Sequence, residues 1–209
     1  MHIQAPQALL FDLGGVLVDI DFTGALRSWA AHSKLPFDEL KRQYQFDSAY
    51  ERHERGEISA SEYFSHIAEV LELSATPAQV ESGWNVIFMG EITTTRLLVE
   101  QARQQLPCYA FTNTNASHMA NWSRLYPGVV SAFDKVYASH EIGLRKPERA
   151  AFEYICRDTA LAPSSILFFD DLLDNVHAAT AAGLQGVLVR SPDDVAASLR
   201  ALGIATSEA

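Results

Sequence analysis

The sequence has 209 residues, of which 48% are hydrophobic and 20% are charged, and its formal net charge is −10. This composition is typical of a globular protein with a large core, and an acidic chain without a cluster of Lys and Arg is a poor partner for nucleic acid or an anionic membrane. The N-terminal apolar run is broken by Asp12 and has no basic leader, so neither a signal peptide nor a membrane span is predicted. Two cysteines, Cys108 and Cys156, are too few for a disulfide framework, which favours free buried thiols in a cytoplasmic protein.

The first predicted element is a strand at residues 8–11, an apolar run that ends at Asp12 and is followed by Gly14 and Gly15. Apolar residues at every position are typical of a parallel strand that is buried on both faces. Open α/β sheets place their ligands at the carboxyl ends of such strands, so Asp12 is a candidate site residue.

Residues 21–90 contain helical patterns and no strand-like run. Capping boxes begin at Ser59 and Thr76, Gly56 separates two helical stretches, and Asp21 is a candidate N-cap. The aromatic side chains expected to form the core of this segment are Trp29, Phe64, Trp84 and Phe88. We therefore expect a helical domain at residues 21–90, inserted after the first strand of a domain made of residues 1–20 and 91–209.

The rest of the chain alternates predicted strands with predicted helices. Strands are expected at residues 108–111, 165–169 and 186–189, with a weaker candidate at 135–138. Helices are expected at residues 147–159, with Pro147 in the first position, at 175–182 before Gly183, and from Pro192 after the N-cap Ser191. The alternation predicts an α/β fold, a Rossmann-like doubly wound parallel sheet with helices on both faces.

Polar residues follow three of the predicted strands, where the strand ends of a parallel sheet converge on one crevice. Several carboxylates cannot ionise together in a crevice without a cation, and paired acids favour Mg²⁺, which takes oxygen ligands. A hydroxyl, an amide and a lysine complete a site for a tetrahedral anion. The residues concerned are Asp12, Thr112, Asn113, Asp170 and Asp171, with Lys146 just before the helix at 147–159.

Four segments resemble, in the same order, the four motifs of the haloacid dehalogenase (HAD) superfamily. They are residues 11–16, residues 111–113, residues 144–147, and residues 169–171 together with Asn175. The helical insert resembles the cap that covers the active site in this superfamily. The resemblance therefore implies a HAD-like core with an inserted helical cap.

The resemblance also implies a reaction. Asp12 would attack phosphorus and become an aspartyl phosphate, which water then hydrolyses. Lys146 would neutralise the phosphoryl oxygens and keep Asp12 ionised. Thr112 would bind a phosphoryl oxygen, and the backbone at Asn113 would assist.

The same resemblance implies a set of magnesium ligands. Mg²⁺ would be bound by Asp12, by the main-chain carbonyl of Gly14 and by Asp171, with Asp170 joining directly or through water. The chain would then contribute position and fixed charge, which is what phosphoryl transfer requires.

One departure from the superfamily pattern concerns Gly14. The superfamily usually has a second Asp two residues after the nucleophile, which protonates the leaving oxygen, and losing such a group costs about 10²- to 10⁴-fold in rate. Three explanations stay open: a substrate with a good leaving group such as a sugar 1-phosphate, a proton donor from the cap such as His53 or Glu57, or a protein that no longer turns over.

A narrower resemblance concerns residues 11–14, 18–22 and 53–59, which are similar to the bacterial α-D-glucose-1-phosphate phosphatase branch. That branch also has Gly at the position of Gly14, but it usually has Asn where this chain has Gly15. His53 and Arg55 are expected to contact the substrate.

The predicted function is Mg²⁺-dependent hydrolysis of a small phosphorylated metabolite, with a sugar phosphate such as α-glucose 1-phosphate as the expected substrate. A 2-haloacid dehalogenase shares the fold and the Asp nucleophile but needs no metal, so the paired Asp170 and Asp171 argue against it. A non-catalytic phosphometabolite-binding protein would account for Gly14, and a phosphomutase is disfavoured by the missing acid. A monomer or a weak homodimer is expected, without nucleic acid or membrane partners.

Overall fold

The computed structural model describes residues 5–204, which contain a five-stranded parallel sheet in the order β5-β4-β1-β6-β7. All five strands were expected, and each begins and ends within one residue of its predicted position. Their bounds are β1 Ala8–Phe11, β4 Cys108–Thr112, β5 Lys135–Ala138, β6 Ile166–Asp170 and β7 Gln185–Leu188. The predicted α/β class and doubly wound parallel sheet are therefore confirmed.

Strand β1 lies at the centre of the sheet, between β4 and β6, and all four of its residues are buried. Successive side chains of a strand point to opposite faces. Leu9 and Phe11 accordingly pack into one apolar cluster and Leu10 into another. The central position of β1 brings Asp12 between the ends of β4 and β6.

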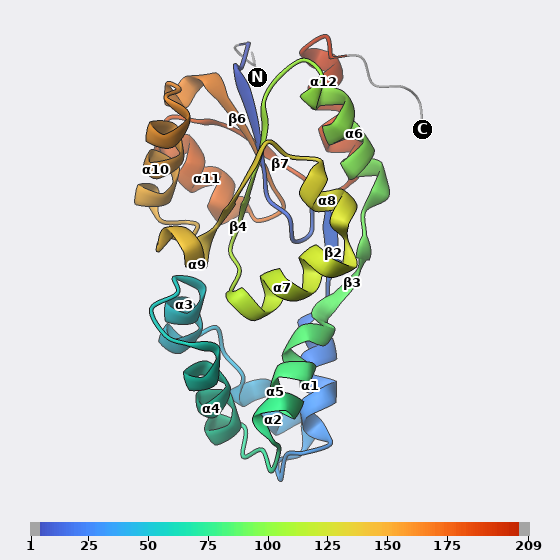
Figure 1. Ribbon diagram of the computed structural model, residues 1–209, viewed down its shortest axis with the longest axis vertical. Coiled ribbons are helices and arrows are strands. Elements are labelled where there is room, and N and C mark those ends of the chain that lie inside the picture. Colours follow the sequence, from blue (N-terminus) through green and yellow to red (C-terminus); the bar gives the residue numbers. More distant parts are fainter. Residues whose placement is uncertain (1–4, 205–209) are drawn as a thin grey trace.

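Helices cover both faces of the sheet (Figure 1). The first face packs against α6 (Thr93–Arg103), α7 (Ala116–Leu125), α8 (Pro127–Ser131) and α12 (Pro192–Ala201). The second packs against α9 (Ser139–Ile142), α10 (Arg149–Thr159) and α11 (Leu173–Ala181). Cys108 and Cys156 are buried free thiols, as expected. None of the helices in residues 5–204 has the length and apolar character that a membrane crossing requires.

Five further helices and a short 3-10 turn form a third apolar cluster of their own. They are α1 Phe22–Ala30, α2 Phe37–Gln43, α3 Ser48–Glu54, α4 Ala60–Val70 and α5 Pro77–Trp84, followed by the turn Asn85–Ile87. Asp21 caps α1, and capping boxes begin α4 and α5. Trp29 and Trp84 are fully buried in this cluster, with ring centroids 6.1 Å apart.

The expectation that residues 21–90 contain no strand is wrong at the end of the segment. Strand β3 (Phe88–Glu91) pairs antiparallel with β2 (Val18–Ile20), and the two strands join the sheet to the helices of residues 22–84 (Figure 1). The pairing partners are about 70 residues apart, so no hairpin signal marks them in the sequence.

The start of helix α10 also differs from its prediction. It begins at Arg149, with Glu148 as the N-cap, and Pro147 lies before it in a cis peptide with Lys146. The side-chain amide of Asn113 accepts from the Lys146 N–H at 2.8 Å and donates to the Lys146 carbonyl at 2.9 Å. This pairing holds the backbone of Lys146 outside the helix.

Candidate active site

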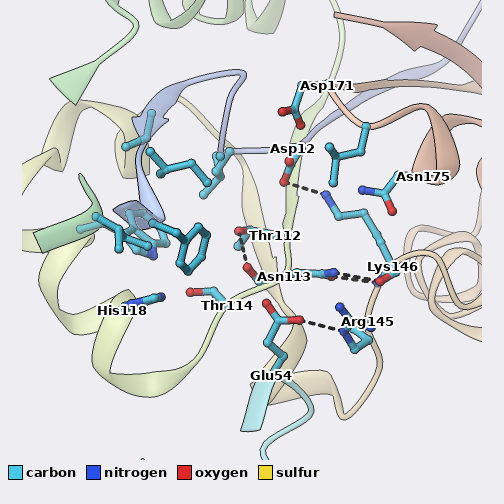
Figure 2. A pocket seen from close by; sticks show the side chains of 18 of the residues that line it. Asp12, Glu54, Thr112, Asn113, Thr114, His118, Arg145, Lys146, Asp171 and Asn175 are labelled. Carbon is cyan, nitrogen blue, oxygen red and sulfur yellow. Dashed lines mark hydrogen bonds and ion pairs between the residues drawn. The ribbon is translucent and has the colours of Figure 1, made fainter. Parts of the chain in front are cut away.

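A cavity of about 370 Å³ lies between the carboxyl edge of the sheet and the helices of residues 22–84. Figure 2 shows Asp12, Asp171 and Lys146 together on one side, Glu54 and Arg145 on another, and Thr112 and Asn113 between them. The polar residues that line the cavity are Asp12, Glu54, Thr112, Asn113, Thr114, His118, Arg145, Lys146, Asp171 and Asn175.

Asp12 and Lys146 form the buried centre of the site. The Lys146 ammonium lies 2.6 Å from a carboxylate oxygen of Asp12 and 2.8 Å from one of Asp170. Its side chain is 1% exposed and passes near the rings of Phe111 and Phe168. Apolar surroundings strengthen these ion pairs, so Lys146 holds Asp12 in one place at the end of β1.

Asp170 differs from the other two carboxylates because protein donors surround it. It accepts hydrogen bonds from Lys146, from the Leu172 N–H at 2.8 Å and from the Asn175 amide at 3.0 and 3.1 Å. It is fully buried and does not line the cavity, whereas Asp12 and Asp171 do. Asp170 therefore fixes Lys146, and Asp12 and Asp171 face the cavity.

The three carboxylates make a site that carries excess negative charge. Their nearest oxygens all lie within 4.8 Å of one another, with one ammonium among them. Burial raises the pKa of Asp12 to about 7 although Lys146 opposes the shift, and burial together with Asp170 raises the pKa of Asp171. A divalent cation with a preference for oxygen would relieve this charge, so the donor set fits Mg²⁺.

Gly15 gives Asp171 room to approach the turn after β1. Its φ is +72°, and a Cβ atom there would lie 2.3 Å from a carboxylate oxygen of Asp171. A side chain at this position would push Asp171 away from its present place. At Gly14, which lines the cavity, a Cβ atom would meet only the Ile20 side chain, at 3.0 Å.

Most of the expected site residues come together, but those expected at residues 53–57 do not. His53, Arg55 and Glu57 are not among the residues that line the cavity. His53 is buried against Tyr63 with ring centroids 4.5 Å apart, and burial lowers its pKa to about 4. Arg55 pairs with Glu57 and Glu148, each at 2.7 Å. Packing of α3 on α4 therefore accounts for His53, whereas Arg55 and Glu57 follow α3 and form ion pairs outside the cavity.

Sequence reasoning did not single out Glu54 or Arg145, which do line the cavity. Tyr50 and Glu54 are four residues apart on α3, so they share one helix face, and both line the cavity. This i, i+4 spacing is the signal that could have identified Glu54. It could not have identified Arg145 as the partner, because that pair joins residues 91 positions apart.

Comparison with known proteins gives related sequences and structures. A family model described as haloacid dehalogenase-like hydrolase matches residues 6–183. A D-ribitol-5-phosphate phosphatase of Bacteroides thetaiotaomicron is 26% identical over 81% of this chain and 84% of its own length. Phosphatase MT3486 of Mycobacterium tuberculosis is 28% identical over 94% of both chains.

A solved structure shares the fold over most of this chain. It is a wild-type HAD family enzyme from Bacteroides thetaiotaomicron in complex with magnesium and inorganic phosphate. It is 25% identical to this chain and superimposes with a TM-score of 0.76, covering 89% of this chain and 95% of its own.

Proposed function

Because this chain belongs to the haloacid dehalogenase-like hydrolase family, we propose that it is a magnesium-dependent phosphatase that hydrolyses a phosphomonoester through an aspartyl phosphate on Asp12. One observation carries the proposal. Asp12 is 8% exposed, lies 2.6 Å from the Lys146 ammonium and opens into a cavity that Thr112 and Asp171 also line. The related phosphatases and the magnesium and phosphate complex support it.

Asp12, Lys146, Thr112 and Asn113 carry out the steps of the proposed reaction at phosphorus. An oxygen of Asp12 attacks phosphorus in line with the leaving oxygen, and Lys146 and the Thr112 hydroxyl bind phosphoryl oxygens. The bond to the leaving oxygen breaks, and the leaving group departs as its alcohol with a proton from solvent. Water then attacks phosphorus of the aspartyl phosphate, which releases inorganic phosphate and restores Asp12. Asn113 positions Lys146 through its two hydrogen bonds to that residue's backbone.

Asp12 and Asp171 would hold Mg²⁺ together with the carbonyl of Gly14, and Asp170 would support the site from behind. The bound ion supplies positive charge next to the developing negative charge of the phosphoryl group. Lys146 and a bound ion would together favour the ionised, nucleophilic form of Asp12, because burial and the charges of Asp170 and Asp171 raise the pKa of this residue.

The lack of an acidic side chain at Gly14 restricts which substrate the enzyme can hydrolyse. No side chain at this position can protonate the leaving oxygen, and His53 and Glu57 do not line the cavity. A leaving group of low pKa needs less protonation, and the anomeric hydroxyl of a sugar is more acidic than an ordinary alcohol. We therefore propose a sugar phosphate as the substrate, with α-glucose 1-phosphate as the first candidate.

The test is phosphate release from α-glucose 1-phosphate, glucose 6-phosphate and D-ribitol 5-phosphate, with Mg²⁺ and with EDTA. We expect release that requires Mg²⁺ and is fastest with the 1-phosphate. No release from any substrate by a folded protein would contradict the phosphatase proposal. Release that survives EDTA would contradict the role of the metal.

Gly14→Asp should restore the missing acid and reduce the difference in kcat between substrates with good and poor leaving groups. We expect kcat with glucose 6-phosphate to rise by up to about 10²-fold, and kcat with the 1-phosphate to rise much less. The Cβ atom that this substitution adds requires a small shift of Ile20, whose terminal methyl group is flexible.

Gly14→Asn is the matched control, because it has the same shape but cannot donate a proton from a carboxyl group. Steady-state kinetics of both variants should separate acid catalysis from packing. Equal rates for the Asp and Asn variants with glucose 6-phosphate would exclude our explanation of Gly14.

A further inference from the structure

The wall of the cavity that residues 22–88 contribute is mostly aromatic. The rings there belong to Phe22, Phe46, Tyr50 and Phe88. Aromatic faces are negative and attract polarised C–H groups, so such a wall suits the carbon face of a polyhydroxylated molecule. The leaving group of a phosphomonoester would lie against this wall, since Asp12 approaches phosphorus from the other side.

Glu54 is the one carboxylate on this wall. It is 3% exposed, and its carboxylate accepts from the Arg145 guanidinium at 2.8 Å. Figure 2 shows the carboxylate directed into the cavity below Thr112 and Asn113. A carboxylate has about four acceptor positions, and the Arg145 guanidinium and the Tyr50 hydroxyl occupy two of them. The others can accept from hydroxyl groups of a ligand.

The positive charges that face the cavity are already paired. Lys146 contacts Asp12 and Asp170, and Arg145 contacts Glu54 and, at 3.3 Å, Glu51. Among the residues that line the cavity, all within the described part of the chain, these are the two cationic side chains. His118 does not add a third at neutral pH, because burial lowers its pKa to about 3.

The charges around Arg145 therefore disfavour a second anionic group on the substrate. A carboxylate or second phosphate at the aromatic wall would lie beside Glu54 without a free cation. A hydroxyl group in the same place would donate to the Glu54 carboxylate, and a hydrogen bond to a charged group is stronger than one between neutral groups.

We propose that Glu54, held by Arg145, is a specificity-determining residue that admits neutral, hydroxyl-bearing leaving groups and excludes anionic ones. This inference rests on the proposed phosphatase function, of which it defines the substrate class: the monophosphate of a sugar or polyol without another acidic group.

The test uses a matched pair of compounds, D-glucitol 6-phosphate and 6-phosphogluconate. The end of the carbon chain away from the phosphate is a hydroxymethyl group in the first and a carboxylate in the second. We expect kcat/KM of the wild-type enzyme to favour the glucitol compound by at least about 10²-fold. Glu54→Gln should reduce this preference by at least about tenfold. An unchanged preference in Glu54→Gln would overturn the proposal.

Glu51→Gln is the control variant. Glu51 lies one turn earlier on α3 and contacts the same Arg145, but it does not line the cavity. This variant should keep the wild-type preference between the two compounds. Thermal unfolding of both variants checks that they are folded, and equal loss of preference in both would assign the effect to Arg145 rather than to Glu54.

Two phosphates without further hydroxyl groups distinguish recognition from proton donation. Glu54→Gln should change the hydrolysis rates of p-nitrophenyl phosphate and 1-butyl phosphate by the same factor, so that the ratio between the two rates stays that of the wild type. A loss of activity confined to 1-butyl phosphate, whose leaving group needs a proton, would make Glu54 the acid catalyst and overturn our assignment.

Binding separates failure of this inference from failure of the proposed function. If the wild type releases no phosphate, the phosphatase proposal fails. Calorimetric titration of the Mg²⁺-loaded protein with the same two compounds then decides the role of Glu54. Tighter binding of D-glucitol 6-phosphate that Glu54→Gln weakens at least tenfold would support it, and equal binding of both compounds would overturn it.

Discussion

Asp12→Asn should lower the rate of phosphate release by roughly 10⁴- to 10⁶-fold while the protein stays folded. An amide oxygen is a far weaker nucleophile than a carboxylate, and no other carboxylate that lines the cavity touches Lys146. Stability should not fall, because the substitution removes a buried charge whose pKa burial has raised, and Lys146 keeps Asp170 as a partner. Single-turnover phosphate release and urea unfolding measure the two effects.

Asp19→Asn is the control for this variant. Asp19 is an exposed residue of β2, seven positions after Asp12, and it does not line the cavity. The Asp19→Asn variant should retain the wild-type rate of phosphate release. An Asp12→Asn protein that still hydrolyses phosphomonoesters within about tenfold of the wild-type rate would rule out Asp12 as the nucleophile.

Lys146→Met should lower the free energy of unfolding by about 3–5 kcal/mol at pH 7 without Mg²⁺, and should abolish turnover. The substitution keeps most of the side-chain volume but leaves two buried carboxylates without their ammonium. Added Mg²⁺ should stabilise this variant more than the wild type, because the site then carries more negative charge. Urea unfolding with EDTA and with Mg²⁺ measures both effects.

The loss of stability in Lys146→Met should shrink as the pH falls from 8 toward 6. The pKa of Asp12 is raised even with Lys146 present, and removing the ammonium raises it further. The folded state then holds a proton that the unfolded chain releases, so a lower pH favours folding. A stability loss in Lys146→Met that grows as the pH falls would contradict this explanation.

Lys135→Met tests whether burial causes the effect. The Lys135 ammonium also lies 2.6 Å from a carboxylate, that of Asp158, but its side chain is 48% exposed. Exposed ion pairs contribute about 0–1 kcal/mol, so this variant should be nearly as stable as the wild type at every pH. Comparable losses in the two lysine variants would exclude burial as the reason.

Local sequence determined most of the sheet and the centre of the site. Runs such as residues 8–11 and 166–170 are apolar at nearly every position, and a buried parallel strand satisfies such a run. Polar residues at the ends of these runs must then meet at one edge of the sheet. That is why Asp12, Thr112 and Asp171 could be grouped from the sequence, and why the structure brings them to one cavity.

The sequence also specified the helix starts of residues 21–90, because capping is a local interaction. Asp21, Ser59 and Thr76 each accept a hydrogen bond from a backbone N–H two or three residues later, as expected. The start of α10 could not be predicted in this way. It depends on Asn113, which holds Lys146 from 33 residues away.

Only the tertiary structure decided which residues complete the cavity. His53 and Glu54 are neighbours in a charged segment, and a helix turns by about 100° per residue, so they point in different directions. Packing of α3 against Tyr63 buries His53 and directs Glu54 to Arg145, a partner 91 residues away. The pairing of β2 with β3 is equally non-local. The sequence by itself therefore determined the sheet and the residues at its strand ends, whereas contacts between distant segments decided the cavity wall, because such contacts leave no periodic signal along the chain.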